Sequence, residues 1–204
     1  MNFTKKQKMY VTLTTLYCCM LIVSNIISNR TFNIGEYMLP SAVIIFPIVY
    51  IINDVMTECF GLKNAQRTIL LAFITNILAV IFFTIAIHLP TQQDFSPYNV
   101  VLGNTPKALS ASLVAYLVGS FINARIMHSM KQQTGEKGLM LRCVLSTLFG
   151  EMCDAFIFIT IMFVGVLPLS VVSQMIVLQG LVKTVYEIIA YPITKQVIKK
   201  IKEC

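Results

Sequence analysis

The sequence predicts an all-α integral membrane protein, a bundle of six spanning helices with both termini on the cytoplasmic side. Three observations predict this class. Apolar residues make up 56% of the 204-residue chain and charged residues only 12%, about half the share that is usual in soluble domains. The apolar residues form six runs, and the basic residues gather between these runs. We expect residues 1–204 to form a single transmembrane domain, because one compact bundle fits this length.

Each of the six runs is long enough to cross the hydrocarbon core, which takes about 20 helical residues. The runs comprise residues 9–28, 38–60, 66–88, 107–128, 139–166 and 170–194. The first follows a cluster of lysines and precedes no small-residue cleavage site, so we expect a retained helix rather than a signal peptide. Helix-breaking residues separate the runs at Gly35, Gly61 to Asn64, Pro90 to Pro106, Gly135 to Gly138, and Pro168. Since the runs are continuous rather than alternating, a β-barrel is not expected.

The basic residues predict the orientation, because cytoplasmic loops of membrane proteins carry an excess of lysine and arginine. With the N-terminus inside, the cytoplasmic segments contain Lys5, Lys6, Lys8, Lys63, Arg67, Arg125, Lys131, Lys137, Arg142, Lys195, Lys199, Lys200 and Lys202. The outer segments contain only Arg30 and Lys107, while Lys183 lies within the sixth run. The net charge of +7 therefore indicates membrane topology, and we expect no nucleic-acid partner.

Charged residues inside the runs are the main functional signal. They are Asp54, Glu58, Glu151, Asp154, Lys183 and Glu187. Each costs about 2.5–3.5 kcal/mol near the centre of a spanning helix, so such residues face the bundle interior. Spacings of three or four residues place each successive pair on one face of its helix. In the first run, Asn25 offers an uncharged donor and acceptor toward the same interior.

The charge balance of these six residues predicts a ligand. Five acids and one lysine sum to −4 if all are ionised, which a low-dielectric interior cannot leave unbalanced. Protonation, pairing with Arg67 or Arg142, or a bound ligand could supply the balance. We therefore expect the cavity to prefer a ligand that donates hydrogen bonds, carries positive charge, or does both.

Structural roles are open for two of the acids. Glu58 could pair with Lys63 or Arg67 near the cytoplasmic boundary, and Glu187 could mainly hold Lys183. For the deeper residues Asp54, Asp154 and Lys183 we expect a functional role, because ionisable residues within the membrane usually serve function. A stripe of small residues, Ala111, Ala115, Gly119 and Asn123, could serve either helix packing or formation of a homodimer.

Enzyme chemistry finds little support in the sequence. It contains no HExxH, P-loop or GxSxG motif and no Ser-His or Cys-His arrangement at a shared depth. The six cysteines form no CxxC pair, so a metal site or a disulfide is not expected. We expect no catalytic residues, no cofactor and no metal.

Several segments resemble the signatures of the queuosine precursor transporter family, also called vitamin uptake transporters. In and just after the second run they are FP at 46–47, Asp54, Glu58, FG at 60–61 and Arg67; elsewhere they are AYLVG at 115–119, STLFGEMCD at 146–154, SN at 24–25, and Lys183. The resemblance extends from about residue 20 to 195, and the STLFGEMCD segment is its most specific part.

This resemblance implies uptake of 7-deazaguanines across the bacterial inner membrane. The candidates are 7-cyano-7-deazaguanine, 7-aminomethyl-7-deazaguanine and queuine. The family is similar in architecture to the six-helix binding subunits of energy-coupling factor importers but is thought to work without their ATPase module. Those subunits dock through small residues in the first helix, and the segment VTLTTLYCCM at 11–20 has no clean series of them.

The chemistry of a deazaguanine suits the intramembrane residues. Its N1–H and 2-amino group lie side by side, and one carboxylate can accept both in charge-assisted bonds. We expect Asp154 or Glu151 to bind this edge and Lys183 or Asn25 to donate to the 6-oxo group. The remaining substrate-binding candidates are Asp54, Glu58 and Glu187. The alternatives are a binding subunit of an energy-coupling factor vitamin importer and, less favoured, a membrane enzyme or sensor.

Overall fold

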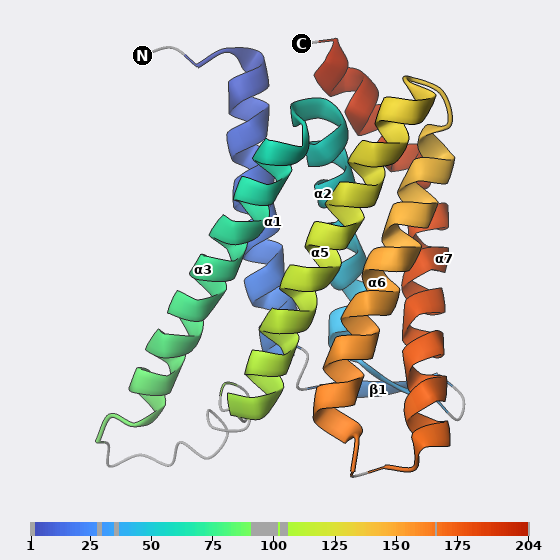
Figure 1. The fold of residues 1–204 in the computed structure, drawn as a ribbon. Helices are drawn as coiled ribbons and strands as arrows, with labels where there is room; N and C mark the ends of the chain where they lie inside the picture. The colour runs from blue at the N-terminus through green and yellow to red at the C-terminus, as the bar shows by residue number, and fades with distance from the viewer. Residues whose placement is uncertain are drawn as a thin grey trace.

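Six α-helices lie alongside one another in the computed structural model, which describes residues 3–27, 30–34, 37–90, 102, 106–165 and 167–203 (Figure 1). They are α1 (Lys5–Ile27), α2 (Phe46–Phe60), α3 (Leu62–Ile87), α5 (Pro106–Thr134), α6 (Leu139–Phe163) and α7 (Leu169–Lys202). The predicted helical class is confirmed, with one small β-hairpin added. Both termini lie at the same end of the bundle, which we call the terminal end; the hairpin lies at the opposite, hairpin end (Figure 1).

The hairpin corrects the predicted start of the second run. Strand β1 (Thr31–Ile34) pairs antiparallel with β2 (Tyr37–Pro40), and a 3-10 turn, η1 (Ser41–Ile44), leads into α2. The prediction of a helix from residue 38 was therefore wrong for 38–45. Pro40 disfavours the helical conformation in the residue before it, and Pro47 is tolerated only in the first turn of a helix. The predicted breaks at Gly35 and across most of Pro90 to Pro106 lie outside the described residues.

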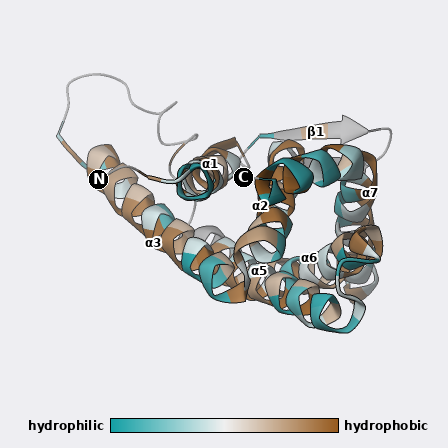
Figure 2. Ribbon diagram, turned by 90° about the horizontal axis from the view of Figure 1, so that it is seen from above, coloured by the Kyte–Doolittle hydropathy of each residue, from teal (hydrophilic) through white to brown (hydrophobic). Residues whose placement is uncertain are grey.

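Helix α2 is the central helix of the bundle. Its 15 residues give a length of about 22 Å, which is less than the roughly 30 Å of a hydrocarbon core. The other five helices are long and apolar enough to cross a membrane within the described residues. Helix α2 is buried along nearly its whole length and contacts all five of them (Figure 2). Its neighbours therefore shield it from lipid, and its polar side chains lie inside the protein.

The outer surface carries large apolar side chains. On α3 the exposed ones are Leu70, Leu71, Ile74, Leu78, Ile81, Phe82 and Ile85. On α7 they include Val177, Leu181, Val185, Ile188, Ile189 and Ile193. Soluble proteins rarely expose apolar patches of this extent, so these surfaces fit a lipid environment. The chain is a multi-pass membrane protein.

Helices α5 and α6 pack closely where two glycines meet. A Cβ placed on Gly119 would lie 2.5 Å from the Tyr50 hydroxyl and 2.8 Å from the Gly150 carbonyl oxygen. A Cβ on Gly150 would lie 2.9 Å from the Gly119 carbonyl oxygen. Ala111 and Ala115 are also buried within the chain. This stripe therefore packs inside the bundle.

We expect Gly119→Ala and Gly150→Ala each to destabilise the protein by about 1–3 kcal/mol, the usual cost of overpacking a close contact. Thermal denaturation in detergent measures the effect. Val114→Ala is the control, because Val114 lies on the same helix and is 46% exposed; exposed substitutions usually change stability by less than about 0.5 kcal/mol. Equal melting temperatures for wild type and both glycine variants would contradict the close contact.

Candidate functional site

Polar and charged side chains form three clusters along α2, α6 and α7. Helix α2 sets their order, because Phe46, Asp54 and Glu58 follow one another from its hairpin end to its terminal end. The Lys183 cluster comprises Phe46, Glu151, Asp154 and Lys183. The Asp54 cluster comprises Asp54, Cys143, Ser146 and Glu187. The Glu58 cluster comprises Glu58, Lys131, Arg142 and Lys202. The three clusters differ in how completely their charges are balanced.

The Lys183 cluster holds one cation between two acids. The Lys183 Nζ lies 2.5 Å from Glu151 Oε2 and 3.1 Å from Asp154 Oδ2, and it sits 4.6 Å from the centroid of the Phe46 ring. Glu151 is fully buried, while Asp154 and Lys183 are each 6% exposed. The spacing of three residues on α6 aims both carboxylates at α7. The lysine neutralises one negative charge, which leaves one in excess if both acids are ionised.

The Asp54 cluster contains no basic side chain. Oxygens of Asp54 and Glu187 and the sulfur of Cys143 all lie within 4.8 Å of one another, and all three residues are buried. The Ser146 hydroxyl lies 3.4 Å from Asp54 Oδ1 and 3.1 Å from the carbonyl oxygen of Cys143. Its single hydrogen can be given to only one of these acceptors at a time. Two carboxylates therefore share a buried space with only weak donors.

The Glu58 cluster is an ion network at the terminal end in which the basic side chains outnumber the acids. Arg142 Nη2 lies 3.0 Å from Glu58 Oε2, while Lys131 Nζ and Lys202 Nζ lie 3.2 Å and 2.8 Å from Glu58 Oε1. Lys202 also pairs with Glu136. Arg142 is buried and donates from Nη1 to the carbonyl oxygens of residues 135 and 137 and to the hydroxyl of residue 134. The network joins the ends of α2, α5, α6 and α7.

Packing brings the far end of α7 to this network. Pro192 lies inside α7, where proline bends a helix, and Figure 1 shows the last turns leaning over the terminal end. Ile198 and Ile201 are buried there against Val55 of α2. This apolar contact places Lys202 within reach of Glu58, although many residues separate Lys202 from the rest of the site.

Several buried oxygens of the first two clusters, and the hydroxyl of nearby Tyr50, have no hydrogen-bond partner among the described residues. They are Glu151 Oε1, Asp54 Oδ2, Glu187 Oε1, Glu187 Oε2 and the Tyr50 hydroxyl. Buried polar atoms almost always have a partner in folded proteins, and leaving one unpaired costs about 1–3 kcal/mol. The arrangement therefore calls for a ligand, a proton or water at these atoms.

The structure corrects two of the predicted structural pairings. Glu58 pairs with Lys131, Arg142 and Lys202 rather than with Lys63 or Arg67, both of which are exposed. The second correction concerns Glu187, which was a candidate partner of Lys183. The lysine instead points to Glu151 and Asp154 on α6, because a neighbouring helix meets it more directly than its own next turn.

Asn25 lies in a different part of the bundle. Its amide donates to Asn76 Oδ1 at 2.7 Å, and its Oδ1 accepts from Ser112 Oγ at 3.2 Å. These partners lie on α3 and α5, so Asn25 joins α1 to those helices. Lys183, which lies between Glu151 and Asp154, is the better placed donor for a ligand bound at those carboxylates.

Three residues of the clusters were missed as site residues at the sequence level. Cys143 was considered only as a candidate for a metal site or a disulfide, yet it shares a helical face with Ser146 and Gly150, and this spacing was the available signal. Lys131 and Lys202 were counted only as topology signals. No local pattern joins them to Glu58, since the contact depends on how the helix ends meet.

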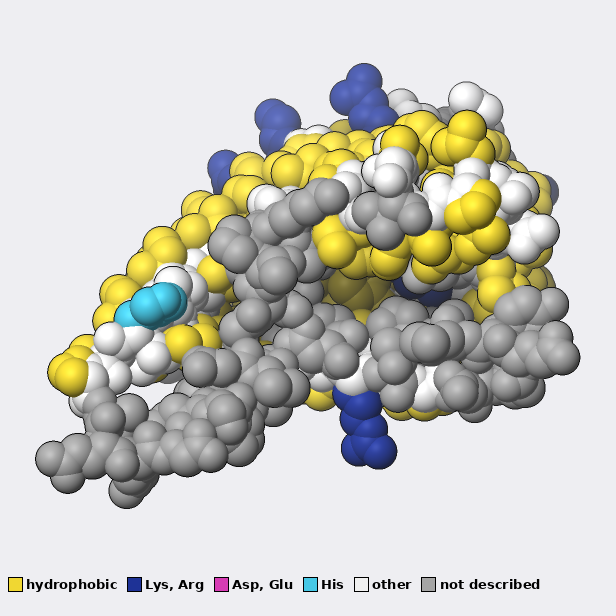
Figure 3. Space-filling model, turned by 90° about the horizontal axis from the view of Figure 1, so that it is seen from below, with side chains coloured by type: hydrophobic (Ala, Val, Ile, Leu, Met, Phe, Trp, Pro, Cys, Tyr) yellow, Lys and Arg dark blue, Asp and Glu magenta, His cyan; other side chains and the backbone are white. Residues whose placement is uncertain are grey.

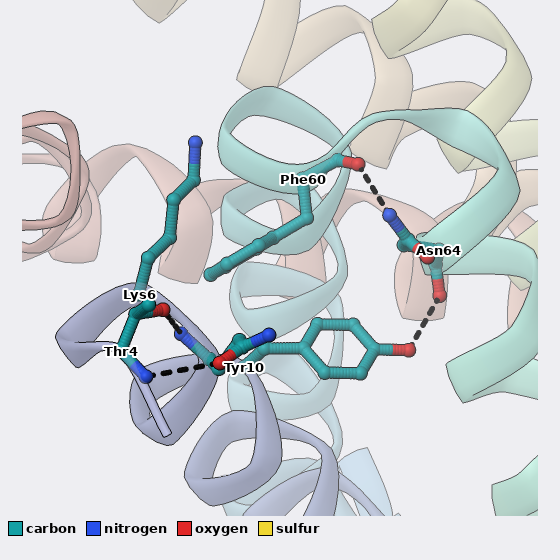
Figure 4. Close-up of a pocket in the computed structure, with 6 residues that line it drawn as sticks. Thr4, Lys6, Tyr10, Phe60 and Asn64 are labelled. Atoms are coloured by element: carbon teal, nitrogen blue, oxygen red, sulfur yellow. Dashed lines mark hydrogen bonds between the residues drawn. The ribbon is translucent and has the colours of Figure 1, made fainter. Parts of the chain in front are cut away.

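Two openings reach the surface near the bundle. Figure 3 views the hairpin end and shows a recess in which atoms of a basic side chain are visible. A separate cleft of about 290 Å³ lies at the terminal end, lined by Thr4, Lys6, Gln7, Tyr10, Phe60 and Asn64 (Figure 4). The Tyr10 hydroxyl donates to the Asn64 carbonyl oxygen at 3.5 Å across this cleft. The cleft has no acid in its lining, so it is separate from the three clusters.

Comparison with known proteins identifies related transporters. The family model described as "Putative vitamin uptake transporter" matches residues 40–197, which include all three clusters except Lys202. A protein of Bacillus subtilis (strain 168) described as "Probable queuosine precursor transporter" is 22% identical over 153 residues, covering 73% of this chain and 67% of its own length. No solved structure matches the chain.

Proposed function

Because the chain belongs to the vitamin uptake transporter family, we propose that it imports queuosine precursors, which are 7-deazaguanines, across the bacterial inner membrane. The family name indicates a transporter rather than an enzyme. The substrate class rests on the name of the Bacillus relative and on the chemistry of the Lys183 cluster. The orientation rests on the excess of basic residues at the terminal end, which faces the cytoplasm.

The observation that carries this proposal is a buried lysine held between two carboxylates, one of which keeps an unpartnered oxygen. A deazaguanine offers N1–H and the 2-amino group as adjacent donors, and a carboxylate binds both. Glu151 or Asp154 takes this edge in our proposal. Lys183 then donates to the 6-oxo group. The ligand thereby replaces contacts between Lys183 and the two carboxylates, and each charged group keeps a hydrogen-bond partner.

The remaining neighbours of Lys183 support a planar, substituted base as the ligand. The Phe46 ring already lies against Lys183 and can stack on the flat face of a purine-like ring. The buried hydroxyl of Tyr50 lacks a partner among the described residues and can bind a ring substituent. An aminomethyl group is cationic, and the excess negative charge of this cluster favours it.

Direct binding and transport measurements test the proposal. Isothermal titration with the three 7-deazaguanines and guanine gives the substrate preference, and proteoliposomes that contain only this chain give uptake without ATP. We expect tighter binding of at least one deazaguanine than of guanine, together with uptake. Binding without uptake would favour a subunit of a larger importer, and recovery of a chemically altered ligand would favour an enzyme.

We expect Asp154→Asn to keep the fold and weaken deazaguanine binding by about 1.5–3 kcal/mol, the value of a hydrogen bond to a charged group. This corresponds to roughly a 10- to 150-fold higher dissociation constant. Titration of the purified variant measures it. Glu203→Gln removes an acid from an exposed position near the C-terminus and serves as the control. Wild-type affinity in Asp154→Asn would remove Asp154 from the substrate site.

A further inference from the structure

The Asp54 cluster is the part of the buried site that substrate recognition does not explain. Asp54 and Glu187 are both fully buried, and three of their four carboxylate oxygens have no partner among the described residues. Their side chains come from α2 and α7 and approach within 4.8 Å. Two ionised carboxylates this close in a low-dielectric interior would repel each other strongly. Something positive must lie between them.

The surrounding groups do not supply that positive charge. Helix α6 presents Cys143 and Ser146 to Asp54, α2 presents Glu58, and α1 presents Tyr17. Glu187 faces Asp54, Cys143 and Glu151. The nearest cations are engaged elsewhere, Arg142 by Glu58 and Lys183 by Glu151 and Asp154. Within the described parts of the chain, no ion pair reaches Asp54 or Glu187.

We infer that Asp54 and Glu187 bind one transported proton between them, at a site separate from the substrate. The proton binds to an oxygen of one carboxylate, and the resulting O–H donates to the other. This removes one negative charge and gives two of the unpartnered oxygens a partner. The pair alternates between a singly protonated state and a doubly ionised state, which persists only while the site is open to water.

The donors around Asp54 favour a proton over a metal ion. The Ser146 hydroxyl lies within hydrogen-bond distance of Asp54 Oδ1, and the Cys143 sulfur lies within 4.8 Å of an oxygen of each carboxylate. Metal binding would require the thiol to lose its proton and both groups to turn their lone pairs toward the ion. A shared proton leaves these donors as they are.

The proton site couples uptake of the substrate to the proton gradient across the membrane, and this part of the inference rests on the proposed function. A carrier without an ATPase accumulates a neutral solute only if a second gradient drives it. The Asp54 cluster lies between the Lys183 cluster and the Glu58 network at the terminal end. A proton that enters with the substrate therefore sits between the Lys183 cluster and the ion network at the terminal end.

Infrared spectroscopy tests proton binding without any substrate. We expect the wild type at neutral pH to show a protonated-carboxyl C=O band that Asp54→Asn and Glu187→Gln each reduce and that Glu203→Gln leaves unchanged. A wild-type spectrum identical in this region to that of the Asp54→Asn/Glu187→Gln variant would overturn the inference. So would a stoichiometric metal, measured by elemental analysis, that disappears in these variants.

Transport in proteoliposomes tests coupling. We expect an inside-alkaline pH gradient to drive accumulation of tritiated 7-cyano-7-deazaguanine, and a sodium gradient to drive none. Glu187→Gln should lose accumulation by at least about tenfold while still exchanging labelled for unlabelled substrate at equilibrium. Wild-type accumulation that does not depend on the pH gradient would overturn the coupling role. So would a Glu187→Gln variant that loses exchange as well as accumulation.

The two readouts keep the proposals distinguishable. Absence of binding of every deazaguanine to the wild type would defeat the proposed function while the infrared result still decides the proton site. Thermal denaturation checks that each variant is folded. Should Asp54→Asn fail to fold, Glu187→Gln alone serves for both tests, because it removes the other of the two carboxylates that share the proton.

Discussion

Lys183→Met is expected to abolish substrate binding and to destabilise the protein by about 3–5 kcal/mol, the cost of leaving buried charges without their partner. Glu151 and Asp154 both lose their cation, and neither has another ion-pair partner within the described residues. The expected fall in melting temperature is about 10 °C for a chain of this size. Thermal denaturation in detergent and titration with 7-cyano-7-deazaguanine measure the two effects.

A double variant separates the loss of charge balance from the loss of side-chain volume. Lys183→Met/Glu151→Gln removes one charge of each sign, so we expect it to recover part of the stability lost in Lys183→Met while binding stays lost. The difference between single and double variants gives the coupling energy of the pair. Lys195→Met is the control, since Lys195 lies exposed on the same helix. Additive effects of the two substitutions would contradict a buried ion pair.

Arg142→Met is expected to be the most destabilising change at the terminal end, with a loss of about 3–5 kcal/mol. The buried guanidinium makes one ion pair with Glu58 and three hydrogen bonds to the turn between α5 and α6. Its removal leaves these acceptors without a donor, and Glu58 keeps only two partly exposed lysines as ion-pair partners. Thermal denaturation and limited proteolysis of the turn measure the result.

Arg125→Met provides the matched control for this prediction. Arg125 lies exposed on α5, so the same substitution should change the melting temperature by no more than about 1–2 °C. A fall in Arg142→Met no larger than in Arg125→Met would show that the Glu58 network does not hold the helix ends together. Substrate affinity should change little in either variant, because neither arginine contacts the Lys183 cluster in the described residues.

The sequence alone predicted the helical membrane class and pointed to the charged residues inside it. Long apolar runs exclude other spanning structures, since each backbone polar group must be satisfied within the helix. The cost of an intramembrane charge makes every such residue conspicuous, and helical spacing placed Glu151 beside Asp154. The second helix was predicted too long because apolar residues at 38–45 continue the hydropathy signal through a hairpin and a turn.

The tertiary structure decided how these charges are divided. From the sequence, Asp54 and Glu58 formed one pair on one helix face, and Glu187 was a candidate partner of Lys183. Side chains from α6 and α7 separate them: Lys183 joins Glu151 and Asp154, Arg142 and Lys202 join Glu58, and Asp54 meets Glu187. A sequence fixes which face of a helix is polar. Which opposing charges meet depends on helix crossing and on the bend near Pro192, and these arise only when all the helices pack.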